Sequence, residues 1–163
     1  MSKHEMAEIR GRYKTLKRFG GVWHIVFTID QYNAIDFYAT ASTLYGIVTI
    51  VGEIKNYDNP DHPRPFTKFD NYMIDYGKLR NLKAKAKALN AIPLLLVFFD
   101  DYTILWDLTD IDIDSRTSWE WVNKDGQNYG CEEELQEMTY LYESEILCKE
   151  TREQTEQKMR LLS

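Results

Sequence analysis

The stretch at residues 46–55, with the sequence GIVTIVGEIK, constrains the fold of this chain more than any other. Its run of Ile and Val residues is typical of a buried β-strand, and the run ends in charged residues. Because strand side chains alternate between two faces, Glu53 and Lys55 are predicted to share one face. Charged groups at the end of a core strand are costly to bury without a partner or an ion. The pattern therefore predicts a charged site at this end of the strand.

Size and composition predict one domain over residues 1–163. The chain is 44% apolar and 13% aromatic, with 8 Gly and 4 Pro, unlike disordered or fibrous proteins. The N-terminus lacks the apolar segment of a secretory signal, and no apolar run approaches the ~20 residues that span a bilayer. Two cysteines without zinc-site spacing indicate reduced thiols. We therefore expect a cytoplasmic protein with no membrane partner.

The net charge of -6 is divided unevenly along the chain. Residues 1–90 hold 14 Lys/Arg against 9 Asp/Glu, a balance of +5, whereas residues 91–163 hold 6 against 17, a balance of -11. The basic half contains the stretch 46–55. A negative total charge therefore does not exclude a phosphate-bearing partner, because the location of the charge decides which partner fits.

Hydrophobic periodicity predicts the order of the elements. In the segment 3–18, apolar residues spaced by three and four predict a helix whose buried stripe is Met6, Ile9, Tyr13 and Leu16. Three strand-like runs then predict an antiparallel meander, and a second helix follows a proline-rich loop. The expected elements are helix 3–18, strands 22–29, 35–41 and 46–55, helix 67–90, and strands 94–99 and 102–108.

Beyond residue 108 the pattern is weaker. The segment 118–123 and the Lys-Asp-Gly-Gln turn after it indicate a strand and a hairpin. The segment 131–162 fits either one long acidic helix or a strand around residues 138–142 followed by a helix, and we favour the second. Residues 3–108 are thus the expected core, and residues 109–163 a C-terminal extension of hairpin plus helix.

Asp36, near the start of the preceding strand, can meet Glu53 on one face of the meander. Mg²⁺ prefers oxygen ligands and commonly takes one or two protein carboxylates. Asp36, Glu53 and the backbone carbonyl of Ile54 fit such a site, and Lys55 would orient or deprotonate a water and offset developing charge. The E-x-K spacing alone does not identify a metal site, since Glu156 and Lys158 repeat it in an expected helix, where residues two apart diverge.

The motif and its placement resemble the PD-(D/E)xK nuclease superfamily. Asp36 takes the place of the family's aspartate, and Glu53-Ile54-Lys55 that of its (D/E)xK, although Ile35 stands where many members have proline. The resemblance implies an α/β (α+β) fold with a restriction-endonuclease-like core, in which helices flank a mixed central sheet with an antiparallel meander (α-β-β-β-α-β). The family often adds an acid from the first helix, where Glu8 is the first choice and Glu5 its competitor.

The resemblance implies a metal-dependent nuclease of phage, mobile-element or junction-resolvase type, acting in the host cytoplasm if phage-encoded. Its catalytic residues would be Lys55, Asp36, Glu53 and Glu8, and its metal, Mg²⁺ or Mn²⁺, would be held by Asp36, Glu53, Ile54 and Glu8. DNA is the expected substrate, RNA stays open, and a homodimer is a further expected partner. The residues expected to contact nucleic acid are Arg10, Lys14, Lys17, Tyr72, Lys78, Lys83 and Lys87.

Two alternatives remain open at this point. Asp36 can cap a hairpin while Glu53 forms an ordinary ion pair with Lys55 or Arg64 at the strand end. The chain can also be a catalytically inactive protein on the nuclease fold that binds nucleic acid or a partner protein.

Overall fold

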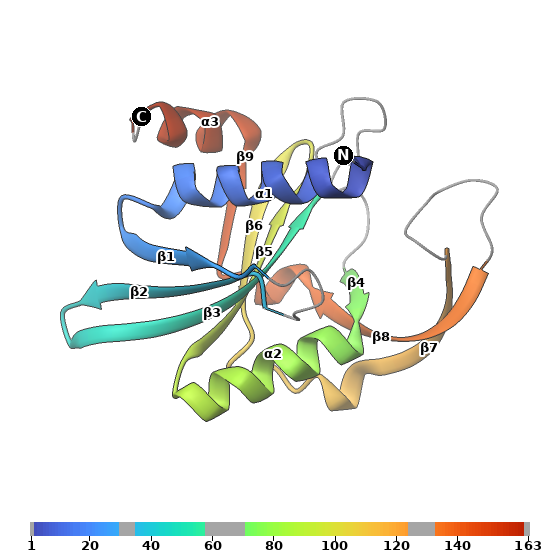
Figure 1. The fold of residues 1–163 in the computed structure, drawn as a ribbon. Helices are drawn as coiled ribbons and strands as arrows, with labels where there is room; N and C mark the ends of the chain where they lie inside the picture. Colours follow the sequence, from blue (N-terminus) through green and yellow to red (C-terminus); the bar gives the residue numbers. More distant parts are fainter. Residues whose placement is uncertain (1, 30–34, 58–70, 124–132, 162–163) are drawn as a thin grey trace.

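The computed structural model shows a mixed α+β fold and describes residues 2–29, 35–57, 71–123 and 133–161 (Figure 1). Short 3₁₀ turns lie at Asp114–Arg116 and Glu143–Glu145. None of the helices in these ranges is long and apolar enough to cross a lipid bilayer. The elements are, in order, α1 (Lys3–Phe19), β1 (Trp23–Phe27), β2 (Phe37–Thr43), β3 (Gly46–Asn56), β4 (Asn71–Asp75), α2 (Tyr76–Leu89), β5 (Ile92–Phe98), β6 (Tyr102–Asp107), β7 (Thr117–Asn123), β8 (Glu133–Tyr142), β9 (Cys148–Thr151) and α3 (Arg152–Leu161).

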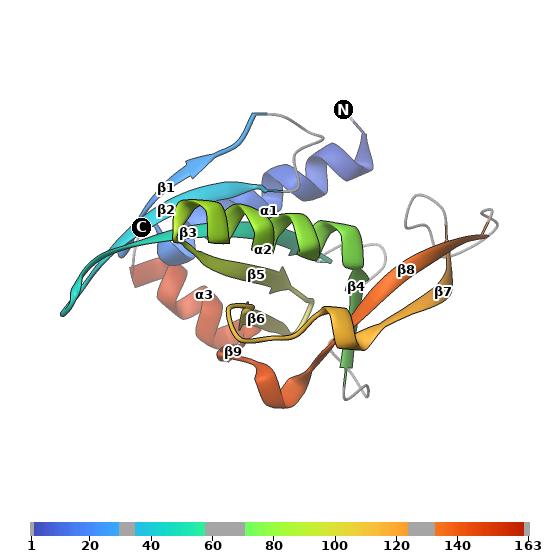
Figure 2. The ribbon, with the colours of Figure 1, turned by 90° about the horizontal axis from the view of Figure 1, so that it is seen from below.

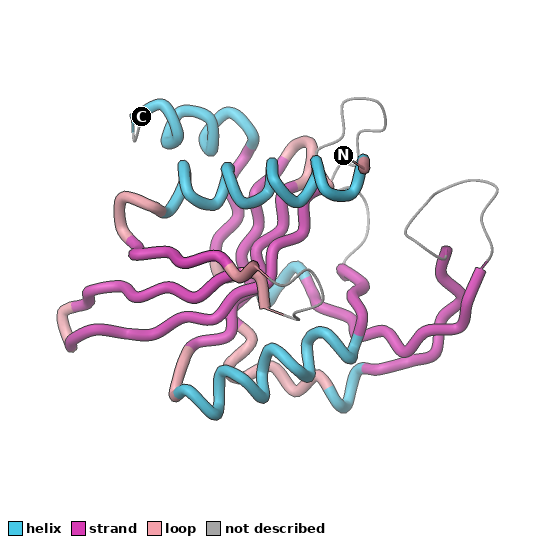
Figure 3. The backbone as a smooth tube through the Cα atoms, in the orientation of Figure 1, coloured by secondary structure: helices cyan, strands magenta, loops and turns pink. Residues whose placement is uncertain are grey.

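The strands form two sheets (Figure 3). The central sheet has the order β1-β2-β3-β5-β6-β9, in which β3 and β5 are parallel and the other neighbours antiparallel. The second sheet has the order β4-β8-β7 and is antiparallel. The predicted meander of three consecutive strands is therefore confirmed, and β5 and β6 confirm the predicted strand pair after the second helix.

Helices cover both faces of the central sheet. Figures 1 and 2 show α1 and α3 on one face and α2 on the other. On the α2 side, Leu79 and Leu82 pack with Val51 of β3 in a core that extends to the second sheet. On the α1 side, Phe19 packs with Phe37 and other apolar residues of the central strands. Alternate residues of β3 thus belong to different layers, as the period of a strand requires.

The helix over residues 3–18 is present as α1, but the prediction of its buried stripe is wrong. Met6, Ile9, Tyr13 and Leu16 are 42%, 51%, 59% and 50% exposed. The buried face is instead formed by Gly11, Thr15 and Phe19. A Cβ on Gly11 would lie 3.0 Å from Cγ2 of Ile54, so the small residue lets the helix approach β3 closely. Periodicity identifies an apolar face, but here that face points to solvent.

The second helix begins later than the predicted 67–90. Residues 71–75 form β4, which pairs with β8, and residues 67–70 lie outside the described ranges. Asp75 ends this strand and caps α2, since its carboxylate accepts a hydrogen bond of 3.0 Å from the backbone N–H of Lys78. Asn90, with a left-handed φ of 50°, ends the helix where expected. Pairing with β8, which is distant in sequence, outweighed the local helical pattern.

The C-terminal region follows the favoured alternative of a strand and then a helix, and one long helix over 131–162 is excluded by β8 and β9. Glu150 of β9 ties this region to α1. Its carboxylate accepts hydrogen bonds from Arg18, at 3.0 Å from Nε, and from Lys158 of α3. Burial alone would raise the pKa of Glu150, but the hydrogen bonds from these two cations lower it to about 2.

Gly52 supplies a test of how β3 packs. A Cβ at this position would lie 2.1 Å from the ring atoms Cε1 and Cζ of Phe37, which is completely buried. We expect Gly52→Ala to lower the free energy of unfolding by about 2 kcal/mol, because overpacking forces the ring or the backbone to move. Chemical denaturation measures this change. Gly77→Ala is the matched control, since among the described residues its Cβ would meet only the Asp75 side chain, at 3.1 Å. Equal effects of the two substitutions would contradict this account.

Candidate active site

Asp36 lies directly before β2, where the ladder between β2 and β3 ends. Its backbone N–H donates to the carbonyl of Gly52 at 2.8 Å, and its Oδ2 accepts from the N–H of Ile54 at 2.6 Å. The side chain thus continues the ladder by one step. In an antiparallel pair, the N–H and C=O of one residue point to the same neighbour. The carbonyl of Ile54 therefore faces the side on which Asp36 lies, as its expected role as a ligand requires.

Glu53 lies beside Asp36 on the α2 face of the sheet and is only 3% exposed. The two carboxyl groups lie close enough for Glu53 to raise the pKa of Asp36. Oε1 of Glu53 is 2.7 Å from Nζ of Lys55 and 3.8 Å from Nζ of Lys78. The prediction that Glu53 and Lys55 share a face is confirmed. Asp36, Glu53 and Lys55 are brought together, and the ion pair expected in the simpler alternative is present within the same cluster.

The electrostatics of this cluster are unusual for carboxylates. Burial, followed by the charge of Glu53, raises the pKa of Asp36 to about 7, although the N–H of Ile54 and the charge of Lys55 act in the opposite direction. Without a cation, the carboxyl of Asp36 is therefore partly protonated near neutral pH. Such a pair offers a place where one more positive charge would be stabilising.

The two lysines respond differently to this environment. Burial alone would lower the pKa of Lys55, but the charge of Glu53 and the hydrogen bond to it outweigh burial and raise the pKa above its usual value. The pKa of Lys78 is lowered, first by burial and then by the charge of Lys55. Lys55 is therefore a fixed positive charge, which favours charge stabilisation and water orientation over proton abstraction.

Lys78 reaches the site from the first turn of α2. It was predicted as a contact to nucleic acid, and the structure places it beside Glu53. Tyr57, just beyond β3, is a neighbour that the sequence reasoning missed. It influences the pKa of Lys55, and its hydroxyl lies 2.9 Å from that of Tyr72. The sequence did contain a signal for Tyr57, because the strand alternation that puts residues 53 and 55 on one face also puts residue 57 on that face.

Glu8 and Glu5 do not join this cluster. Glu8 of α1 forms an ion pair of 2.6 Å with Arg12, and Arg12 also donates to the carbonyl of Thr28 at 2.8 Å. Glu5 closes the capping box of α1 with Ser2. Within the described ranges, no three His, Cys, Asp or Glu residues are grouped so that they could hold a metal. The carboxylates that the structure brings together are those of Asp36 and Glu53.

Among the residues predicted to contact nucleic acid, Tyr72 requires a correction. It lies on β4 rather than on the second helix and is 6% exposed. Its ring stacks on Trp106 with a centroid distance of 5.4 Å. Tyr72 is therefore part of the core, and its hydroxyl is hydrogen-bonded to that of Tyr57.

The predicted basic residues are divided between the two faces of the sheet, because α1 and α2 lie on opposite sides (Figures 1 and 2). Some of them form hydrogen bonds within the chain: Lys14 donates to the side chain of Asn56 at 3.3 Å, and Lys83 donates to the carbonyl of Ile111. Lys87 is exposed in the last turn of α2, and Nζ of Lys17 lies 5.7 Å from the ring centroid of Tyr13. Arg10 is half-buried on α1. Only the residues of α2 lie on the face to which Glu53 and Lys55 point.

The second E-x-K sequence behaves as predicted. Glu156 of α3 pairs with Arg152 at 2.8 Å, whereas Lys158 binds Glu150 of β9. The two side chains serve different partners. The same spacing therefore converges on one site in a strand and diverges in a helix.

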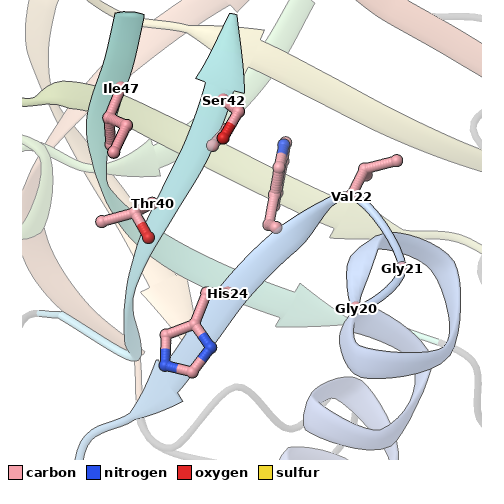
Figure 4. A pocket seen from close by; sticks show the side chains of 9 residues that line it. Gly20, Gly21, Val22, His24, Thr40, Ser42 and Ile47 are labelled. Carbon is pink, nitrogen blue, oxygen red and sulfur yellow. The ribbon is translucent and has the colours of Figure 1, made fainter.

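A hollow of about 330 Å³ lies at the other end of the meander (Figure 4). It is lined by the glycine turn after α1 and by residues of β1, β2 and β3, among them His24, Thr40, Ser42 and Ile47. Neither Asp36 nor the Glu53 cluster contributes to it. The hollow is therefore separate from the candidate active site.

The donor set of the cluster fits a hard divalent cation. Two adjacent carboxylates and a backbone carbonyl are oxygen ligands of the kind that Mg²⁺ and Mn²⁺ take. Burial and the charge of Glu53 raise the pKa of Asp36, and a bound cation would oppose both effects. Two lysines at the same place suit a phosphate group. Comparisons with protein-family models, with curated proteins and with solved structures found no match to this chain.

Proposed function

We propose that this chain is a metal-dependent nuclease that hydrolyses phosphodiester bonds, with DNA as its substrate. The observation that carries the proposal is the neighbouring placement of two carboxyl groups: Asp36, held by the N–H of Ile54, lies beside the buried Glu53, and Lys55 is 2.7 Å from Glu53. Neighbouring buried carboxylates repel each other, so a pair of this kind is stable with both groups ionised only if positive charge lies close to it. Ligand chemistry and charge both point to a divalent cation.

The arrangement of elements supports a restriction-endonuclease-like core. A helix precedes the meander β1-β2-β3, and α2 then leads to β5, which pairs in parallel with β3. This is the order expected for the PD-(D/E)xK superfamily. The strand β4, which pairs with β8 outside the central sheet, is an addition to that order. The proposed site lies at the end of β3, where Asp36 is hydrogen-bonded to the backbone of Ile54 and α2 covers one face of the sheet.

The roles of the residues follow from their positions. Asp36, Glu53 and the carbonyl of Ile54 would hold Mg²⁺ or Mn²⁺, which when bound supplies Lewis-acid activation of the phosphodiester and of water. Lys55 keeps its charge and would orient the attacking water and balance negative charge on the phosphate oxygens. Lys78, in the first turn of α2, would bind a phosphate of the substrate from the other side. Glu8, the auxiliary acid expected from the first helix, is paired with Arg12 in this structure and is left out of this set.

A second candidate function is supported by the same ion pair. With Glu8 held by Arg12 and Glu53 held by Lys55, the described residues offer a small ligand set, as in a nuclease fold that binds nucleic acid or a partner protein without cleaving. Binding that needs no metal would distinguish this function from catalysis.

Cleavage assays test the proposal directly. The purified chain is incubated with supercoiled, linear, branched and single-stranded DNA and with RNA, in Mg²⁺, Mn²⁺ or EDTA. We expect cleavage of DNA that stops in EDTA and in Asp36→Ala, while Glu156→Ala, in the second E-x-K sequence, retains it. Cleavage that survives in Asp36→Ala with the fold intact would remove this site assignment. Tight DNA binding without cleavage under any condition would support the inactive alternative.

A further inference from the structure

The hairpin formed by β7 and β8, here called the arm, carries exposed tryptophans. Figures 1 and 2 show the arm projecting beyond the end of α2. Trp119 and Trp121 are 63% and 68% exposed, and Leu135 is 47% exposed. The register pairs Trp121 with Leu135, and Trp119 with Glu137, so these side chains share one face of the arm. Large apolar side chains grouped on a surface in this way mark an interaction site.

The outward face of α1 is a second apolar surface. Met6, Ile9, Tyr13 and Leu16 form a stripe along it, here called the α1 stripe, and each is at least 42% exposed. Residues seven apart lie almost above one another after two turns of a helix. Lys3, Arg10 and Lys17 have this spacing and form a basic row beside the stripe. The inner face of α1 is occupied by the sheet, so the stripe is available to another molecule.

The two surfaces are complementary in charge. Residues 117–123 and 133–142 of the arm contain four Glu and no Lys or Arg. Helix α1 contains six Lys/Arg and two Glu. An acidic arm repels the phosphates of a nucleic acid, so its tryptophans are poorly suited to contact DNA. An apolar surface with a basic margin is the surface that it does fit.

We propose that two copies of this chain associate through an exchange of arms, in which the tryptophan face of each arm docks on the α1 stripe of the other copy. The high exposure of both surfaces shows that they do not cover each other within the described part of one chain. Reciprocal docking makes two identical contacts about a two-fold axis and closes the assembly as a dimer. This inference does not rest on the proposed nuclease function.

Sedimentation velocity over a range of about 1 to 100 μM tests the association. We expect a concentration-dependent shift from monomer to dimer. Trp119→Ser combined with Trp121→Ser should weaken the dimer more than about tenfold, and Ile9→Ser combined with Tyr13→Ser should do the same, because buried aromatic residues dominate interface energies. Leu44→Ser is the matched control, since Leu44 is 99% exposed at the tip of the β2–β3 hairpin. Circular dichroism confirms that each variant is folded.

Charge-reversing substitutions on both surfaces show whether the arm contacts α1 of the other copy. Glu133→Lys with Glu137→Lys on the arm should weaken the dimer, as should Lys3→Glu with Lys17→Glu on α1. The chain that carries all four changes should recover dimerisation. A wild-type chain that stays monomeric at 100 μM overturns the proposal. A dimer that is weakened by the substitutions in the arm but not by those in α1 also overturns it, since that result indicates contact between two arms. Failure of the chain with all four changes to recover dimerisation overturns it as well.

Discussion

Asp36→Asn is expected to make the metal-free protein more stable than wild type at pH 8, by up to about 4 kcal/mol. The carboxyl of Asp36 has a pKa of about 7 in the fold, against a usual 3.8, chiefly because it is buried and next to Glu53. An uncharged amide of the same shape avoids both costs. Urea denaturation at pH 8 in EDTA measures the difference. Asp110→Asn, on an exposed turn, is the control and should leave stability unchanged.

The pH dependence of this effect has a defined sign. Between pH 4 and 7, the folded state keeps the Asp36 proton while the unfolded chain releases it, so the folded state binds more protons. The free energy of unfolding that Asp36 contributes therefore falls as pH rises through this window and is constant above about pH 8. The difference between Asp36→Asn and wild type should grow from near zero at pH 4 to its maximum at pH 8. A difference that is independent of pH would contradict the assigned pKa.

A divalent cation should reverse the order of stability. Binding to the folded state alone adds RT ln(1 + [L]/Kd), about 2.7 kcal/mol at one hundred times Kd and about 4.1 kcal/mol at one thousand times Kd, so the order reverses above roughly one thousand times Kd. We expect Mn²⁺ to raise the midpoint of unfolding of wild type at pH 8 and to leave Asp36→Asn almost unchanged. This readout does not depend on cleavage, so it separates metal binding from catalysis. Equal responses of the two proteins would show that Asp36 is not a ligand.

Lys55→Met is expected to lower the cleavage rate by about a hundredfold to a thousandfold, the range for loss of a group that stabilises charge in the transition state. Lys78→Met is expected to have a smaller effect, mainly on KM, because Lys78 lies farther from Glu53, at 3.8 Å against 2.7 Å. The raised pKa of Lys55 implies that its charge is what matters. Lys55→Arg should therefore keep more activity than Lys55→Met.

These comparisons need a control for stability, because Lys55→Met leaves Glu53 buried without its closest cation. Such a change commonly costs about 3 kcal/mol. Lys85→Met is the matched control, since Lys85 is exposed on α2 and is not among the residues expected to contact nucleic acid, and assays are made where every variant is folded. If Lys55→Arg were as inactive as Lys55→Met while both remained folded and bound DNA, charge alone would not explain the role of Lys55.

The meander and the charged end of β3 could be predicted from the sequence because both depend on local pattern. Alternation with a period of two is a property of the strand itself, and it placed Glu53 and Lys55 together correctly. The same argument separated this E-x-K from Glu156 and Lys158, whose helix sends them to different partners. Strand type and side-chain period are thus readable without knowledge of the neighbours.

The burial of α1 and the start of α2 could not be predicted, since both depend on partners distant in sequence. The apolar stripe of α1 satisfies every rule for a buried face, yet Gly11 and Thr15 face the sheet because small residues permit close contact with Ile54. The local pattern of residues 71–75 predicts helix, but these residues form a strand because they pair with β8. A local pattern indicates which faces are apolar, and it does not indicate which face meets the rest of the chain.

By itself the sequence determined the strands of the meander and the strand pair after α2, the shared face of Glu53 and Lys55, and the presence of an acid near the start of β2. Only the tertiary structure decided that Asp36 would meet Glu53, that Lys78 and Tyr57 would join them, and that Glu8 would be held by Arg12. The physical reason is that alternation is fixed by bonds within one strand. Proximity between Asp36 and Ile54, in contrast, is fixed by the register of two strands and by the helix packed on each face.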